Sequence, residues 1–75
     1  MNIEIRLRKL ESRYRAALSA AVAAKARYLA LQGEPGSTAA SIARAEEAWQ
    51  RLELQKTSLV ARMAELESFE HTAAV

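Results

Sequence analysis

The strongest constraint on this chain is a heptad pattern that runs through residues 3–31. Apolar side chains recur there at alternating intervals of four and three residues, at Ile3, Leu7, Leu10, Tyr14, Ala17, Ala21, Ala24, Tyr28 and Leu31. This spacing lines one seam of an α-helix and is typical of coiled coils. The same alternation returns at Thr38, Ile42, Ala45, Trp49, Leu52, Lys56, Leu59, Met63 and Leu66. The sequence therefore predicts two long helices, each with one seam.

Residues 33–37 separate the two seams and contain the turn-forming residues of the chain. We expect Gly33 just after the first helix with a positive φ, and Pro35 where continuation must stop. Asn2 is expected to cap the first helix, and Ser37 or Thr38 the second. The predicted organisation is one domain over residues 1–75, with helices over about 3–32 and 38–70, a turn over 33–37 and a frayed tail over 71–75.

The two seams fit together in one antiparallel register. The pairs are Leu31 with Ile42, Tyr28 with Ala45, Ala24 with Trp49, Ala21 with Leu52, Ala17 with Lys56, Tyr14 with Leu59, Leu10 with Met63 and Leu7 with Leu66. Large side chains meet small ones near the loop, which lets the helices approach closely without voids. The predicted fold class is all-α, a two-helix antiparallel coiled-coil hairpin.

A single hairpin of 75 residues with an alanine-rich seam buries little apolar surface. We expect this burial to be too small to offset the conformational entropy that the chain loses on folding. We therefore expect two copies to dimerise into a four-helix bundle. Charges flank the seam unequally, with Arg6, Arg13, Arg27 and Arg62 on one edge and Glu4, Glu11, Glu46, Glu53, Glu67 and Lys25 on the other. Pairing the basic edge of one hairpin with the acidic edge of another is one route to such a dimer.

Seven larger apolar residues lie outside the seam: Ile5, Leu18, Val22, Leu29, Leu54, Val60 and Phe69. Leu18, Val22 and Leu29 form a second stripe on the first helix, and Val60 falls on the same side of the second. A contiguous apolar stripe usually marks a contact surface. We predict that these four residues bind a partner, either a second copy or a protein presenting an amphipathic helix with basic flanks.

No residue pattern points to catalysis, a cofactor, a metal or a small-molecule substrate. The chain has no cysteine, His71 is its single histidine, and Gly33 and Gly36 match no phosphate-binding spacing. Lys56, at a seam position, is expected to extend its ammonium group to the edge and fix the register. We predict that the protein is not an enzyme.

The sequence therefore favours a small cytoplasmic adaptor or co-chaperone that binds proteins through the stripe. No stretch reaches the apolar length of a membrane span. The alternative is a plasmid- or phage-type regulator, a hairpin dimer that binds nucleic acid through Arg6, Arg8, Arg13 and Arg15. In length and layout the chain resembles the hairpin co-chaperones of bacterial type III secretion systems and plasmid-encoded RNA-binding hairpin dimers. That resemblance implies the same two functions and assigns no site residue.

Overall fold

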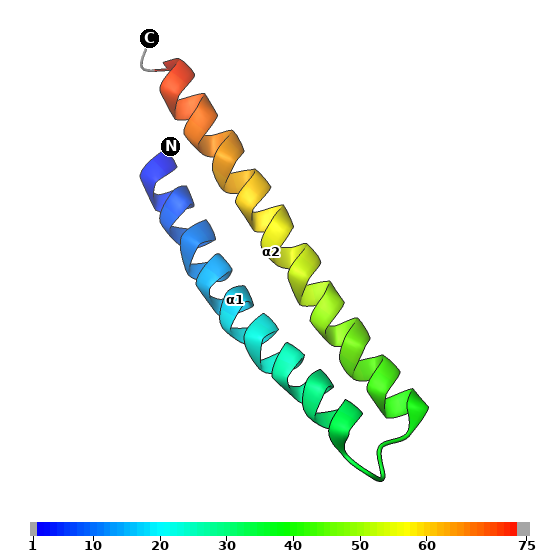
Figure 1. Ribbon diagram of the computed structural model, residues 1–75. Helices are drawn as coiled ribbons and strands as arrows, with labels where there is room; N and C mark the ends of the chain where they lie inside the picture. Colours follow the sequence, from blue (N-terminus) through cyan, green and yellow to red (C-terminus); the bar gives the residue numbers. More distant parts are fainter. Residues whose placement is uncertain (1, 74–75) are drawn as a thin grey trace.

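The computed structural model describes residues 2–73, with side chains up to residue 69. Helix α1 spans Ile3–Gly33 and helix α2 spans Ala39–Ala73. The two helices run antiparallel, so the first turns of α1 lie beside the last turns of α2 and the loop closes the opposite end (Figure 1). The rod measures 59 × 15 × 14 Å. The predicted all-α helical hairpin is confirmed.

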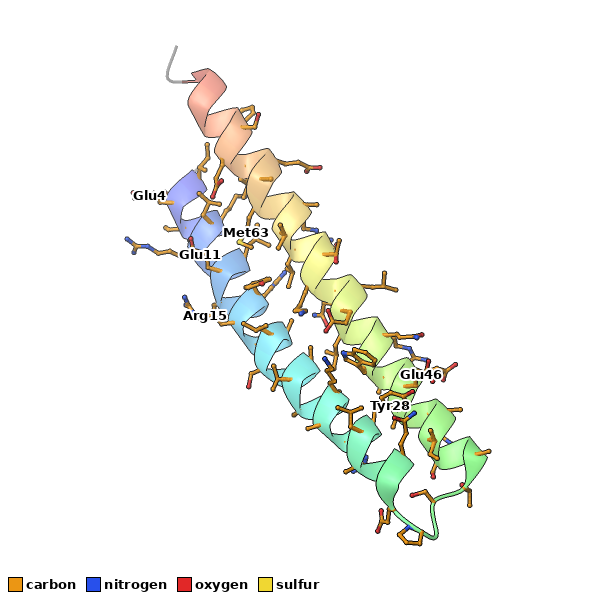
Figure 2. The ribbon with its side chains drawn as sticks, in the orientation of Figure 1. Glu4, Glu11, Arg15, Tyr28, Glu46 and Met63 are labelled. Carbon is orange, nitrogen blue, oxygen red and sulfur yellow. The ribbon has the colours of Figure 1, made fainter. Side chains whose placement is uncertain are left out.

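Burial follows the predicted seams. In α1 the side chains shielded from solvent are the nine of the first seam, and every other position of that helix is exposed. In α2 the second seam is shielded from Ile42 to Leu66, together with Ser41, Glu46 and Glu53 at its margin. Tyr28 and Met63 lie between the two helices (Figure 2). The heptad period thus defines the packing face of both helices.

The core is narrow and made of small side chains. Its buried residues are Ala17, Ala21, Ala45 and Leu59, which are 4%, 1%, 8% and 4% exposed. The rings of Tyr28 and Trp49 stack with their centroids 5.7 Å apart. This contact fits the predicted register, which places Tyr28 beside Ala45 and Trp49 beside an alanine of α1. The small residues leave the space that the two rings occupy.

Side-chain caps begin both helices. The Asn2 Oδ1 atom accepts hydrogen bonds from the backbone N–H groups of Glu4 and Ile5, at 3.0 and 3.4 Å. The Thr38 Oγ1 atom accepts from the N–H of Ser41 at 3.1 Å, so Thr38 rather than Ser37 caps α2. These bonds satisfy N–H groups that have no partner inside the helix.

The end of α1 differs from the prediction. Gly33 is the last helical residue, and no glycine in the described chain has a positive φ. Glu34 instead terminates the helix in an extended conformation, and its N–H donates to the Leu31 carbonyl at 3.3 Å. The following Pro35 explains this, because a residue before proline is pushed towards extended backbone.

Helix α2 extends further than expected, to Ala73 rather than about residue 70. No glycine or proline follows Leu66 in the chain, so the sequence contains no residue that would break the helix there. Of the tail expected to be frayed, residues 71–73 are helical and residues 74–75 lie outside the described part. Among the described helices, none is both long and apolar enough to cross a membrane.

Candidate protein-binding surfaces

Two sides of the hairpin flank the seam, and each carries a different set of residues. We define the stripe face as the side that carries Leu18, Val22, Leu29 and Val60, and the basic face as the side that carries Arg6, Arg13, Arg27 and Arg62. In the heptad of each helix, the positions on one side of the seam carry the stripe residues, and the positions on the other side carry the arginines. A ligand on one face therefore leaves the other face open.

The stripe face exposes all four residues that the sequence predicted as a partner-binding surface. Leu18, Val22, Leu29 and Val60 are 38%, 63%, 53% and 48% exposed. Both helices contribute to the stripe. The prediction that these residues lie on the surface is confirmed, whereas their binding role stays a prediction.

Charged residues surround the stripe. By the heptad register, five glutamates and three cations share this face, a formal charge of −2: Glu4, Glu11, Glu46, Glu53, Glu67, Arg8, Arg15 and Lys25. Figure 2 shows Glu4, Glu11 and Arg15 in turn along α1. The stripe is thus an apolar surface with a weakly acidic border.

A polar cluster lies at the margin of this face. The Trp49 Nε1–H group donates to Glu53 Oε1 at 3.0 Å, and the Lys56 ammonium lies 3.0 Å from Glu53 Oε2. The Lys25 ammonium lies 5.5 Å from the centroid of the Trp49 ring. The hydrogen bond from Lys56, then that from Trp49, and the positive charge of Lys25 lower the pKa of the Glu53 carboxyl.

Lys56 therefore behaves as expected for a seam lysine. Its stem lies in the seam, its side chain is 20% exposed, and its ammonium pairs at the edge. Sequence reasoning missed the contacts of Trp49 with Glu53 and Lys25. The four-residue spacing of Trp49 and Glu53 and the three-residue spacing of Glu53 and Lys56 were the available signal, because such pairs are neighbours on a helix.

The basic face contains a groove of about 720 Å³ at the open end of the hairpin, away from the loop. Its lining comes from both helices: Ile3, Arg6, Lys9, Leu10, Arg13, Arg62, Glu65, Leu66 and Phe69. Arg6 and Arg13 of the predicted nucleic-acid set line this groove. Arg8 and Arg15 do not line it and fall on the stripe face, so the structure does not gather those four arginines on one surface.

The whole basic face carries a strong positive charge. The register assigns seven cations and one glutamate to it, a formal charge of +6: Arg6, Lys9, Arg13, Arg27, Arg44, Arg51, Arg62 and Glu65. The chain as a whole has a formal charge of only +2. Folding thus separates charge laterally, with a strongly basic side opposite a weakly acidic one.

No candidate metal centre is present among the described side chains, since no three histidine, cysteine, aspartate or glutamate residues lie close enough together to hold an ion. Comparisons of the chain with protein-family models, with curated proteins and with solved structures found no match. The two faces of the hairpin are therefore the basis for a functional proposal.

Proposed function

We propose that this protein is a small protein-binding assembly module that acts as a homodimer. In the proposed dimer two hairpins pack through their stripe faces and form a four-helix bundle. The observation that carries the proposal is the exposure of four apolar side chains from both helices on one face. Such a unit would serve as an adaptor or co-chaperone, and we propose that it acts in the cytoplasm.

The exposed surface of the hairpin supports pairing with a second copy. The chain exposes 5730 Å² at a mass of 8.3 kDa. A compact monomer of that mass exposes about 4,600 Å², so the rod carries an excess of about 1,100 Å². A stable dimer buries about 800 Å² on each partner. One face-to-face contact of that size would therefore remove most of this excess surface.

The thin core supports the same conclusion. Among the described side chains, three of the four buried core residues are alanines: Ala17, Ala21 and Ala45. Small side chains contribute little apolar area per residue, and hydrophobic stabilisation scales with that area. Packing of the stripe against a second hairpin would add larger side chains to the core.

Electrostatics favours the stripe face over the basic face for this contact. Like-charge repulsion scales with the product of the two charges. Two faces of −2 repel about nine times less than two faces of +6 at equal separation and screening. The basic face would therefore stay open in a symmetric dimer.

The test compares the wild-type chain with Val22→Glu/Val60→Glu and with a matched control, Leu54→Glu. Leu54 is 71% exposed and lies opposite the seam, outside the stripe. We expect size-exclusion chromatography with light scattering to give two chains for the wild type and the control, and one chain for the double variant. Circular dichroism at low temperature should show helix in all three.

Two results would contradict the proposal. One is a double variant that remains as dimeric as the wild type. The other is a control that loses the dimer to the same extent, because Leu54 does not belong to the stripe.

A further inference from the structure

The open-end groove on the basic face combines two kinds of lining. Its floor is apolar, with seam residues Ile3, Leu10 and Leu66 half-buried and Phe69 62% exposed. A phenylalanine exposed to this extent beside other apolar side chains offers a contact that the hairpin itself does not use. Apolar side chains of a ligand would lose their contact with water here.

The rim of the groove is cationic. Arg6, Lys9 and Arg13 come from α1 and Arg62 comes from α2, with Glu65 as the acidic member of the lining. None of these four cations forms an ion pair with a carboxylate among residues 2–69. Cations gathered in this way repel one another, and carboxylates of a ligand would relieve that repulsion.

We propose that this groove binds an acidic amphipathic helix of another protein. Arg6 and Arg13 are seven residues apart on one side of α1, which is about 10.5 Å along the helix axis. Carboxylates two turns apart on a helix lying along the groove have the same separation. Apolar residues three and four positions along that helix would then face Leu10 and Phe69.

The apolar floor distinguishes this ligand from a nucleic acid. The phosphate backbone of a duplex is bound by charge and gains nothing from Leu10, Leu66 or the exposed Phe69. The apolar side of an acidic amphipathic helix would contact the floor, and its carboxylates would pair with the cations of the rim. The groove also lies opposite the stripe face, so its occupancy does not depend on the proposed dimer.

The probe is a fluorescein-labelled peptide of three heptads, with leucine at positions a and d, glutamate at e and g, and alanine elsewhere. Binding to the full chain is followed by fluorescence anisotropy. A peptide with glutamine in place of glutamate tests the charge requirement. A labelled DNA duplex tests whether any polyanion suffices.

Two pairs of variants test the groove residues. Arg62→Glu is matched by Arg51→Glu, the same charge reversal on α2 outside the groove lining. Phe69→Ala is matched by Leu54→Ala, another exposed apolar residue of α2. We expect Arg62→Glu and Phe69→Ala each to weaken peptide binding by about tenfold or more, since each removes a direct contact. The two controls should change affinity less than about threefold.

Three results would overturn the proposal: the absence of peptide binding, equal affinities for Phe69→Ala and the wild type, or duplex binding as tight as peptide binding. The variant Val22→Glu/Val60→Glu keeps the groove residues and, under conditions where circular dichroism shows it to be helical, should bind the peptide within about threefold of the wild type. Its behaviour separates a failure of the groove from a failure of the dimer.

Discussion

The close approach of the helices at Ala21 gives a sharp test of the seam. Ala21 is 1% exposed, the least exposed of the buried core residues. Ala21→Leu would add three heavy atoms where the two helices already touch. Inserting methylene groups into a packed core costs about 1–3 kcal/mol. For a domain of this size, that corresponds to a fall in Tm of roughly 4–24 °C.

The matched control is Ala20→Leu, one residue earlier on the same helix. Ala20 is exposed, so its leucine would extend into solvent and change the free energy of unfolding by no more than about 0.5 kcal/mol. Both variants have nearly the same helix propensity, so any difference between them reports packing. The assay is thermal unfolding by circular dichroism at one fixed protomer concentration, because dimer stability depends on concentration.

An Ala21→Leu variant as stable as Ala20→Leu would refute the reasoning. It would mean that the helices are far enough apart at that point to accept a leucine. Loss of stability in both variants would equally contradict the burial pattern.

Other predictions concern the core, a cap and the polar cluster. Leu59→Ala should lower the free energy of unfolding by about 2–5 kcal/mol in denaturant titrations, because Leu59 is 4% exposed; a loss below about 1 kcal/mol would contradict its burial. Thr38→Ala should cost about 1 kcal/mol in thermal unfolding and Ser37→Ala clearly less, whereas equal losses would mean that Thr38 is not the cap. The pKa of Glu53 lies below its ordinary value of 4.5, so its charged form stabilises the fold above that pH and this contribution is lost as the pH falls through the lowered pKa. Glu53→Gln should therefore be less stable than the wild type near neutral pH, with a difference that shrinks on acidification; a difference independent of pH would argue against the ion pair with Lys56.

Most of the fold could be predicted because one period governs the whole chain. Alternating intervals of four and three residues identified every shielded side chain of α1. The antiparallel register could be predicted because seam residues pair throughout at an offset that leaves room for the loop, and the contact of Tyr28 with Trp49 agrees with that pairing. The exposed apolar residues followed directly, since they are the large ones outside the two seams.

Two details were not predicted. One depends on competition between neighbouring residues at the end of α1, and the other depends on how side chains of the two helices lie in space. Gly33 suggested a left-handed cap, but Pro35 fixed the preceding Glu34 in extended backbone and ended α1 without one. The groove was not predicted because two of its lining residues, Leu10 and Leu66, were assigned to the core. Two helices alone cannot enclose a seam, so these residues remain half-buried, as most of the seam does, and form a floor beside Phe69.

The central claim, that the hairpin works as a dimer through its stripe face, is tested most directly by sedimentation equilibrium of the wild-type chain at low and high salt. We predict a mass of two chains at both, with tighter association at high salt, because like-charged stripe faces repel less when screened. A single-chain mass at every concentration would contradict the dimer. A dimer that dissociates as salt rises would instead mean that basic and acidic edges hold the two hairpins together.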